Sequence, residues 1–156
     1  MAAAGGFRCA ACRCQQPAIK RLALRRCPTV LMLSLKRFAF TSMTFASCVK
    51  DITAVWLPPD SLSLTEFCSG NLSVAGQAPD EPVYDLMGLV SHIGSIDGGH
   101  YTATVRGAAS SAEQSKGHLG GQWYHCNDEH VRVAEMPSSQ ASSQAYLLLY
   151  VRRNYA

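Results

Sequence analysis

Short stretches in which apolar and polar residues alternate follow one another along the chain, and long helical periodicity is absent from the sequence. The run at 29–38 is apolar enough to predict a central strand, and Pro28 precedes it at a position where proline is tolerated. Alternation also begins at Ile19, and a shorter strand is predicted at 50–57. Residues 62–67 are predicted to form a single helical turn.

The second half of the chain contains further short segments typical of strands. Strands are predicted at five segments bounded by turn residues, namely 84–91, 100–106, 122–126, 131–133 and 145–152. Strands at such close spacing favour an antiparallel sheet over alternating strands and helices. The predicted fold is therefore mainly β, an antiparallel sheet with few short helices.

Two segments interrupt this series. Residues 70–82 are rich in Gly, Pro, Ser and Asn and predict a surface loop, whereas residues 107–121 have little to bury and predict a mobile hairpin insertion. Because neither side of the loop is large, we expect both inside one domain over residues 7–153. Residues 1–6 are small and predict a flexible N-terminal end.

Composition narrows the function classes. The 156 residues are 47% hydrophobic, which suits one globular domain, and the net charge of +3 is too weakly clustered to indicate nucleic-acid binding. No apolar run reaches the roughly 20 residues of a membrane span, and the start lacks a secretion signal. We therefore expect an intracellular protein, cytoplasmic or nuclear and not secreted, with neither nucleic acid nor membrane as partner. Its seven cysteines then indicate thiols or metal ligands rather than disulfides.

The stretch GGHYTATV places His100 at the mouth of a predicted strand, directly after Gly98 and Gly99, which permit close approach of another backbone. A neutral imidazole accepts a proton from a nucleophile when its other ring nitrogen donates to a fixed acceptor. Asn127 and Asp128 end the strand at 122–126 and either could be that acceptor. The alternative is an ordinary rim histidine and an ordinary turn.

The motif around His100 belongs to an ordered series: YDLMGLVSHIGSIDGGHYTATVR, GQWYHCNDEHV and SSQAYLLLYVRR, preceded by CAACRCQQPAIKRLALRRCPTVLMLSLKRF and KDITAVWLPPDSLSL. This series, over residues 7–153, resembles the histidine-box half of the ubiquitin-specific proteases, a papain-like family of cysteine proteases. The resemblance implies the sheet-bearing half of a papain-like α+β cysteine protease domain. It also implies deubiquitination, the thiol-dependent hydrolysis of ubiquitin C-terminal (iso)peptide bonds, with ubiquitin or ubiquitinated proteins as partners and no required cofactor.

The resemblance assigns roles to the motif residues. His100 is the general base, Asn127 orients it, and Asp128 is the candidate for assisting the oxyanion or taking over the orientation. Gly98 and Gly99 would line the narrow channel that admits the Gly-Gly tail of ubiquitin. Tyr101 is grouped with them as a substrate-binding candidate, and packing around the site is the favoured role for Tyr101, Trp123 and Tyr124.

Other motif residues receive no chemical role. The motif at 36–38 is a structural landmark of the family's sheet, so it is assigned no catalytic task. His92 and His130 have no matched role, and each is predicted to be a surface histidine satisfied by solvent.

The nucleophile is not recognisable in this sequence. A thiol protease needs a thiolate, and the family places it early in the domain in a motif resembling Gly-Asn-Thr-Cys, which is absent here. Cys126 precedes Asn127, but strand alternation points it to the opposite face. Cys48 and Cys68 are predicted to be isolated, buried or incidental thiols.

We therefore predict that the chain alone does not cleave ubiquitin conjugates. It would be part of a longer deubiquitinase or a genuine short form. The alternatives are a non-catalytic ubiquitin-binding or regulatory module, and an unstable fragment whose sheet exposes an apolar face.

Cys9 and Cys12 have the spacing of a zinc knuckle. One such pair is half a site, and by the resemblance it is the second half of a zinc ribbon. Cys14 and Cys27 are possible substitutes for the other pair. The alternative is free thiols at a frayed end.

Overall fold

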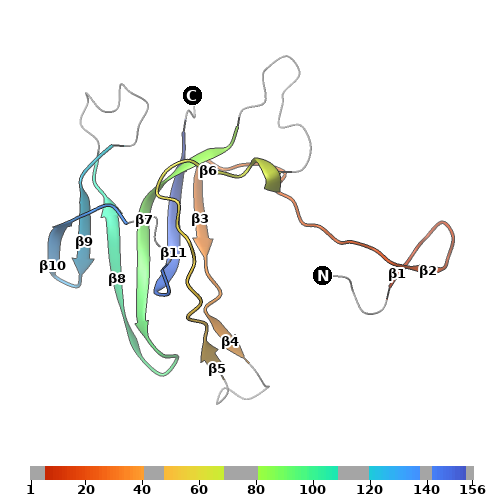
Figure 1. Ribbon diagram of the computed structural model, residues 1–156, viewed down its shortest axis with the longest axis horizontal. Coiled ribbons are helices and arrows are strands. Elements are labelled where there is room, and N and C mark those ends of the chain that lie inside the picture. Colours follow the sequence, from red (N-terminus) through yellow and green to blue (C-terminus); the bar gives the residue numbers. More distant parts are fainter. Residues whose placement is uncertain (1–5, 41–47, 69–80, 109–119, 138–141, 154–156) are drawn as a thin grey trace.

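The computed structural model describes residues 6–40, 48–68, 81–108, 120–137 and 142–153, and it is dominated by one antiparallel sheet (Figure 1). The sheet has seven strands in the order β10-β9-β8-β7-β11-β3, with β6 paired to β7. The strands are β3 (Val30–Ser34), β6 (Leu62–Ser63), β7 (Val83–Gly94), β8 (Gly99–Arg106), β9 (Trp123–Asn127), β10 (His130–Ala134) and β11 (Ala145–Arg152). The predicted fold class is confirmed. In the described ranges no helix is long and apolar enough to cross a membrane.

The five strands predicted in the second half of the chain all form, within a few residues of their expected ends. The longest is β7, which pairs with β11 on one side and with β8 on the other. It therefore occupies the middle of the sheet, the position that the sequence had suggested for 29–38.

The prediction of a central strand at 29–38 is wrong. Strand β3 ends at Ser34 and lies at the sheet edge, bonded only to β11 among the described strands. Its side chains alternate: Leu31 and Leu33 pack on the core, whereas Val30 and Met32 are exposed. A continuous apolar run thus indicates a strand with apolar residues on both faces, but it does not indicate whether that strand is central or at the edge of the sheet.

The segments after β3 are less regular than predicted. Strand β4 (Phe38–Phe40) pairs with β5 (Cys48–Lys50) as a separate two-stranded sheet, so the strand expected at 50–57 begins and ends earlier. The carboxylate of Asp51 accepts the backbone N–H of Thr53 at 2.8 Å and turns the chain away. The turn expected at 62–67 consists of β6 followed by the 3-10 helix η2 (Thr65–Phe67).

The N-terminal region stands apart from the sheet. Strands β1 (Phe7–Arg8) and β2 (Gln15–Gln16) form a small hairpin, which an extended connection joins to the rest (Figure 1). The alternation beginning at Ile19 gives no strand: the segment is exposed, and among the described residues its first pairing is the bridge at Leu24. The loop predicted at 70–82, the insertion at 107–121 and the end at 1–6 fall largely outside the described residues.

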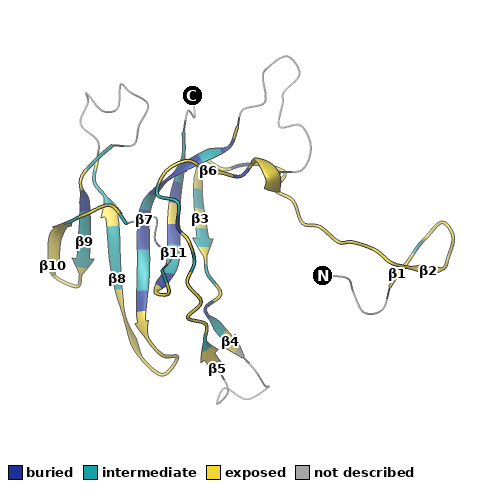
Figure 2. Ribbon diagram, in the orientation of Figure 1, coloured by how far each residue is buried: buried dark blue, intermediate teal, exposed yellow. Residues whose placement is uncertain are grey.

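The core lies on one face of the sheet, beneath β7 and β11 (Figure 2). Leu86 of β7 and Tyr150 of β11 are cross-strand neighbours and are almost completely buried. Tyr84 is equally buried. Its hydroxyl donates to the carbonyl of Pro28 at 2.6 Å, and the hydroxyl of Tyr150 donates to the carbonyl of Pro58 at 3.0 Å. Each hydroxyl thereby anchors an irregular segment to the sheet.

Arg37, in the motif at 36–38, is 3% exposed and has a structural role. Its guanidinium donates to the carbonyls of Ala145 at 2.9 Å, Ser142 at 3.0 Å and Asp51 at 3.1 Å, and also to that of Thr53. One side chain thus ties the irregular segment after β5 to the start of β11 and the residues just before it.

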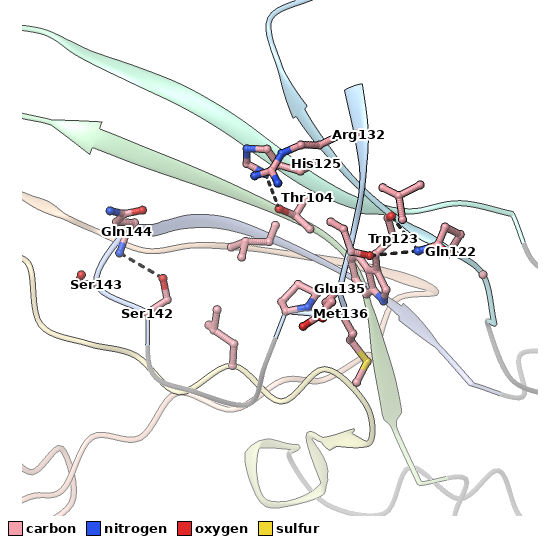
Figure 3. Close-up of a pocket in the computed structure, with 16 residues that line it drawn as sticks. Thr104, Gln122, Trp123, His125, Arg132, Glu135, Met136, Ser142, Ser143 and Gln144 are labelled. Atoms are coloured by element: carbon pink, nitrogen blue, oxygen red, sulfur yellow. Dashed lines mark hydrogen bonds between the residues drawn. The ribbon is translucent and has the colours of Figure 1, made fainter. Parts of the chain in front are cut away.

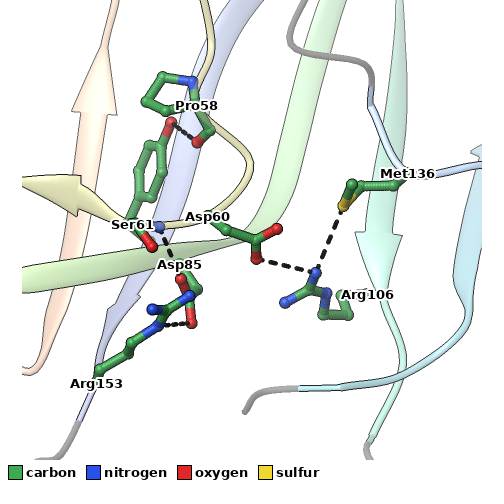
Figure 4. A network of polar contacts seen from close by, with 8 residues as sticks. Pro58, Asp60, Ser61, Asp85, Arg106, Met136 and Arg153 are labelled. Atoms are coloured by element: carbon green, nitrogen blue, oxygen red, sulfur yellow. Dashed lines mark hydrogen bonds and ion pairs between the residues drawn. The ribbon is translucent and has the colours of Figure 1, made fainter.

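Acidic and basic side chains fasten the opposite end of the sheet (Figure 4). The carboxylate of Asp85, 1% exposed, accepts the Nε–H of Arg153 at 2.6 Å and the backbone N–H of Ser61 at 3.0 Å. Asp60 pairs with Arg106 at 3.4 Å. The chain end after β11 is thereby attached to the loop that precedes β6.

Candidate active site

His100 is the second residue of β8, directly after the hairpin that joins β7 to β8. The four-residue loop closes when the N–H of Ser95 donates to the carbonyl of Gly98 at 2.9 Å. Gly94 opens the loop with a φ of +120°, a conformation that favours glycine. His100 is therefore placed by a tightly closed hairpin at the end of two long strands.

The two glycines before His100 have different surroundings. A Cβ at Gly99 would lie 2.6 Å from the carbonyl oxygen of Ile93 and closer still to the ring of His92, so packing inside the chain requires glycine there. A Cβ at Gly98 would have no atom of the described residues within 4 Å. Only Gly98 is thus open toward the surroundings, as a channel-lining residue would be.

Asn127 is the last residue of β9, and the two-residue loop at 128–129 joins it to β10. Asp128 has a φ of +50°, which Asp tolerates and which short hairpin loops demand. Pairing of Ala103 with Cys126 carries Asn127 opposite Thr102, so Asn127 is a diagonal neighbour of His100 on the same face. Asn127 and Asp128 therefore form an ordinary turn and at the same time place a side chain beside His100, so these two interpretations of the residues are compatible.

The side chains of His100 and Asn127 meet. Nε2 of His100 lies 2.5 Å from Oδ1 of Asn127. Since an amide oxygen only accepts, Nε2 carries the proton, and Nδ1 of the neutral ring keeps its lone pair. Asp128 lies farther away, with Oδ2 at 3.9 Å from Nε2, and its side chain is 75% exposed.

His92 is buried, and the prediction of a surface histidine is wrong. It is 3% exposed and packs against three rings: Tyr101 at 4.6 Å between centroids, Phe38 at 5.5 Å and Tyr146 at 6.2 Å. Among the residues that the structure describes, its Nδ1 has no hydrogen-bond partner. Burial, and then the charge of Lys50, lower the pKa of His92, so the ring is held neutral.

The strand register gives the reason for this burial. His92 lies directly across from Tyr101, on the face opposite to His100, where rings from β4 and β11 also arrive. These contacts join segments far apart in the sequence, so alternation within β7 could not reveal them. His130, in contrast, is exposed, as predicted.

Tyr101 is half-exposed on top of His92, while Trp123 is buried with the guanidinium of Arg106 at 5.0 Å from its ring. Tyr124 is partly buried. Trp123 and Tyr124 pair with Arg106 and Val105 at the end of β8 remote from His100, so of the three aromatic residues Tyr101 alone packs beside the hairpin, where it presents a large exposed surface.

The cysteines lie away from His100. In the part of the chain that the structure describes, no cysteine sulfur is hydrogen-bonded to its imidazole. Cys126 pairs with Ala103 across the sheet, and alternation turns its side chain from the face that carries Asn127. Cys68 is not isolated, contrary to prediction, because its sulfur lies 3.2 Å from that of Cys27.

Cys9 and Cys12 lie in the turn of the N-terminal hairpin, closed by the N–H of Arg13 donating to the carbonyl of Cys9 at 2.8 Å. The backbone N–H groups of Cys12 and Ala11 lower the pKa of the Cys9 thiol, which favours a thiolate. Over the described ranges, no group of three or more potential ligands gathers. The pair suits zinc chemically but supplies only two of the four ligands of a structural site.

A hollow of about 1270 Å³ opens beside β8 and β9 (Figure 3). Alternation along β8 places it on the same face of the sheet as His100. Its lining includes Thr104 and His125, whose Oγ1 and Nδ1 are 3.2 Å apart, together with Arg132. His100 and Asn127 are not part of the lining. Sequence analysis gave no signal for this hollow, because the segments around 134–137 and 142–144 that complete it are irregular.

Comparison with known proteins gives consistent matches. The family model described as "Ubiquitin carboxyl-terminal hydrolase" matches residues 5–150. Ubiquitin carboxyl-terminal hydrolase 45 of Mus musculus is 35% identical over 85% of this chain and 18% of its own length. Ubiquitin carboxyl-terminal hydrolase 8 of Saccharomyces cerevisiae is 32% identical over 94% of this chain and 29% of its own.

Solved structures agree with the sequence matches. The SAGA Ubp8/Sgf11/Sus1/Sgf73 DUB module bound to ubiquitin aldehyde gives a TM-score of 0.72 at 29% identity, covering 97% of this chain and 30% of that one. A yeast SAGA DUBm structure gives 0.71 at 29% identity, with 96% and 29% covered. The chain thus spans less than a third of the length of these relatives.

Proposed function

Because the chain belongs to the ubiquitin carboxyl-terminal hydrolase family, and within it resembles the ubiquitin-specific proteases, we propose that it provides the base-bearing half of a cysteine deubiquitinase site. The hydrogen bond between His100 and Asn127 at the end of two neighbouring strands carries the proposal. The reaction served is thiol-dependent hydrolysis at the C-terminus of ubiquitin.

His100 acts as the general base through Nδ1. The amide of Asn127 holds the proton on Nε2, so the lone pair of Nδ1 is free to take the proton of a thiol. The His100 side chain is 46% exposed, which leaves room for a reacting group from outside the described residues. Asn127 is a positioning residue in this scheme, since it acts through the imidazole.

Asp128 contributes by its charge. Its carboxylate lies 3.9 Å from Nε2, too far for a hydrogen bond, and its negative charge faces the ring that receives the thiol proton. Because its side chain is 75% exposed, solvent screens this charge, and we assign orientation of the ring to Asn127 rather than Asp128.

The substrate tail runs past Gly98, Gly99 and Tyr101. Gly98 is open, and a side chain there would occupy the space that an extended peptide needs. Gly99 serves the channel indirectly, because it lets the hairpin rest on His92. Tyr101 supplies exposed aromatic surface for packing along the peptide.

The chain by itself does not turn over substrate, since no described cysteine reaches His100 and the sequence lacks the family's nucleophile motif. Purified chain mixed with a fluorogenic ubiquitin C-terminal amide should release no fluorophore above the buffer rate. Release that disappears on His100→Ala would contradict this part of the proposal and identify a nucleophile within the chain.

Binding of ubiquitin is tested separately. We expect isotope-labelled chain to show shifts at the β7–β8 hairpin, around Gly98 and His100, when ubiquitin is added, as the SAGA module relatives were solved with ubiquitin. Ubiquitin without its two C-terminal glycines is the matched control and should leave that hairpin unshifted. Equal shifts with both ligands, or none with either, would exclude a tail channel here.

Cys9 and Cys12 provide one half of a zinc site in this proposal, as a pair of cysteines in a preformed turn whose backbone N–H groups lower the pKa of Cys9. Zinc bound there would hold the hairpin to whatever segment supplies the other two ligands. Metal analysis of the purified chain should find well below one zinc per chain, and Cys12→Ser should remove what is found.

A further inference from the structure

Two cysteine sulfurs lie in contact at the end of the sheet that is remote from His100. Sγ of Cys27 is 3.2 Å from Sγ of Cys68, although 41 positions separate them in sequence. Cys27 is 6% exposed and Cys68 is partly exposed. Both are free thiols, and a bond of about 2.0 Å between them would require only a small movement of either side chain.

Backbone pairing holds these two sulfurs together. Leu24 forms a parallel bridge with Cys68, and its N–H donates to the carbonyl of Phe67 at 2.7 Å. On the other side, the carbonyl of Pro28 accepts the hydroxyl of the fully buried Tyr84. The segment carrying Cys27 is thus fixed to the core at one end and to the C-terminal end of η2 at the other.

The hydrogen bonds assign different tasks to the thiols. The thiol of Cys68 donates to the carbonyl of Leu64 at 3.2 Å, which leaves its sulfur to accept the thiol proton of Cys27. Burial raises the pKa of Cys27 to about 11, and the neighbouring Cys68 adds to this effect. The more accessible Cys68 is therefore the sulfur that an oxidant meets first, with Cys27 behind it.

We propose that Cys27 and Cys68 are a redox modification site, at which a peroxide converts the thiol pair into a reversible disulfide. The sulfur of Cys68 attacks the peroxide, becomes a sulfenic acid and releases water. The sulfur of Cys27 then displaces the hydroxyl of that sulfenic acid as a second water. Two electrons pass from the sulfurs to the peroxide, and both thiol protons end in water. A reducing thiol reverses the step by exchange.

The disulfide would link the residue before Pro28 to the residue after η2 and close a long loop in the chain. Cross-links of this kind constrain the unfolded state, so the oxidised protein should unfold at higher temperature. His100 lies near the other end of β7, roughly 30 Å away at the usual rise of a strand. The modification therefore goes beyond the proposed function and leaves the His100–Asn127 pair unchanged.

Disulfide mapping tests this directly. The reduced full chain is treated with hydrogen peroxide in native buffer, its remaining thiols are alkylated, and its peptides are identified by mass spectrometry. We expect a peptide pair joined through Cys27 and Cys68, lighter by two hydrogens than the separate thiols and released by dithiothreitol. The pair Cys9 and Cys12 in the N-terminal hairpin gives different peptides, so the two pairings are distinguished.

Variants separate this bond from general oxidation. Cys68→Ser keeps a hydroxyl donor for Leu64 but should abolish both the joined peptide and the rise in the thermal midpoint on oxidation. Cys48→Ser removes another partly buried thiol and should retain both. The proposal would be overturned if Cys27 and Cys68 were still alkylated after peroxide treatment. It would also be overturned if the peptide pair joined through them formed no more often in the native chain than in the urea-unfolded chain.

Discussion

Replacing Arg37 with alanine should lower the free energy of unfolding by about 3–5 kcal/mol. The guanidinium is 3% exposed and donates to four backbone carbonyls in two separate parts of the chain, 51–53 and 142–145. Hydrogen bonds from charged groups are worth about 1.5–3 kcal/mol each, but water reaching the vacated carbonyls returns part of the loss, so the four do not add fully. The expected loss is a large share of the roughly 5–15 kcal/mol that stabilises a domain.

Urea denaturation followed by tryptophan fluorescence measures this loss, because Trp123 is buried in the fold. Arg37→Lys should recover only part of it, since an ammonium cannot reproduce the planar fork of donors. Arg21→Ala is the control: it removes the same charge from an exposed segment and should change stability by no more than about 0.5 kcal/mol. Equal midpoints for the two alanine variants would refute the structural role of Arg37.

Three further changes probe other parts of the account. Arg153→Ala removes the ion pair of the buried Asp85 and should lower the free energy of unfolding by about 3 kcal/mol in urea denaturation. Adding Asp85→Asn removes the unpaired buried charge and should restore part of the loss. No restoration would contradict the idea that this charge causes the loss. Burial lowers the pKa of His92 below its ordinary value of about 6.5, so the unfolded state binds its proton more readily and stability should fall as pH drops below 6.5. In His92→Phe the free energy of unfolding should depend less on pH below 6.5 than in the unmodified chain. The same pH dependence in both proteins would exclude His92 as the cause. Gly99→Ala forces a methyl group against His92 and should cost about 1–3 kcal/mol in thermal unfolding, whereas Gly98→Ala should cost less than about 0.5, and equal costs would contradict the packing described for the hairpin.

Local pattern was sufficient for the strands that face the core on one side. β8, β9 and β11 are short segments bounded by turn residues, and they lie where the sequence placed them. The run at 29–38 is apolar on both faces, and its position at the sheet edge depends on which strands pair with it. Alternation predicts that a strand forms, whereas its neighbours in the sheet are decided by contacts with distant segments.

Sequence motifs predicted only those site residues that lie in short, recognisable turns. His100 and Asn127 were found because a short hairpin and a two-residue turn leave clear sequence signals, and the resemblance then gave their roles. The burial of His92 escaped prediction, since its partners come from β4 and β11. The contact between Cys27 and Cys68 likewise joins segments that share no local pattern.

The protonation of the His100 ring tests the central claim most directly. Nitrogen-15 NMR of the chain, at a pH where the imidazole is neutral, reports which ring nitrogen carries the hydrogen. We expect the hydrogen on Nε2 in the unmodified chain and a mixture of the two tautomers in Asn127→Ala. A hydrogen on Nδ1, or identical spectra for both proteins, would contradict a base oriented by Asn127.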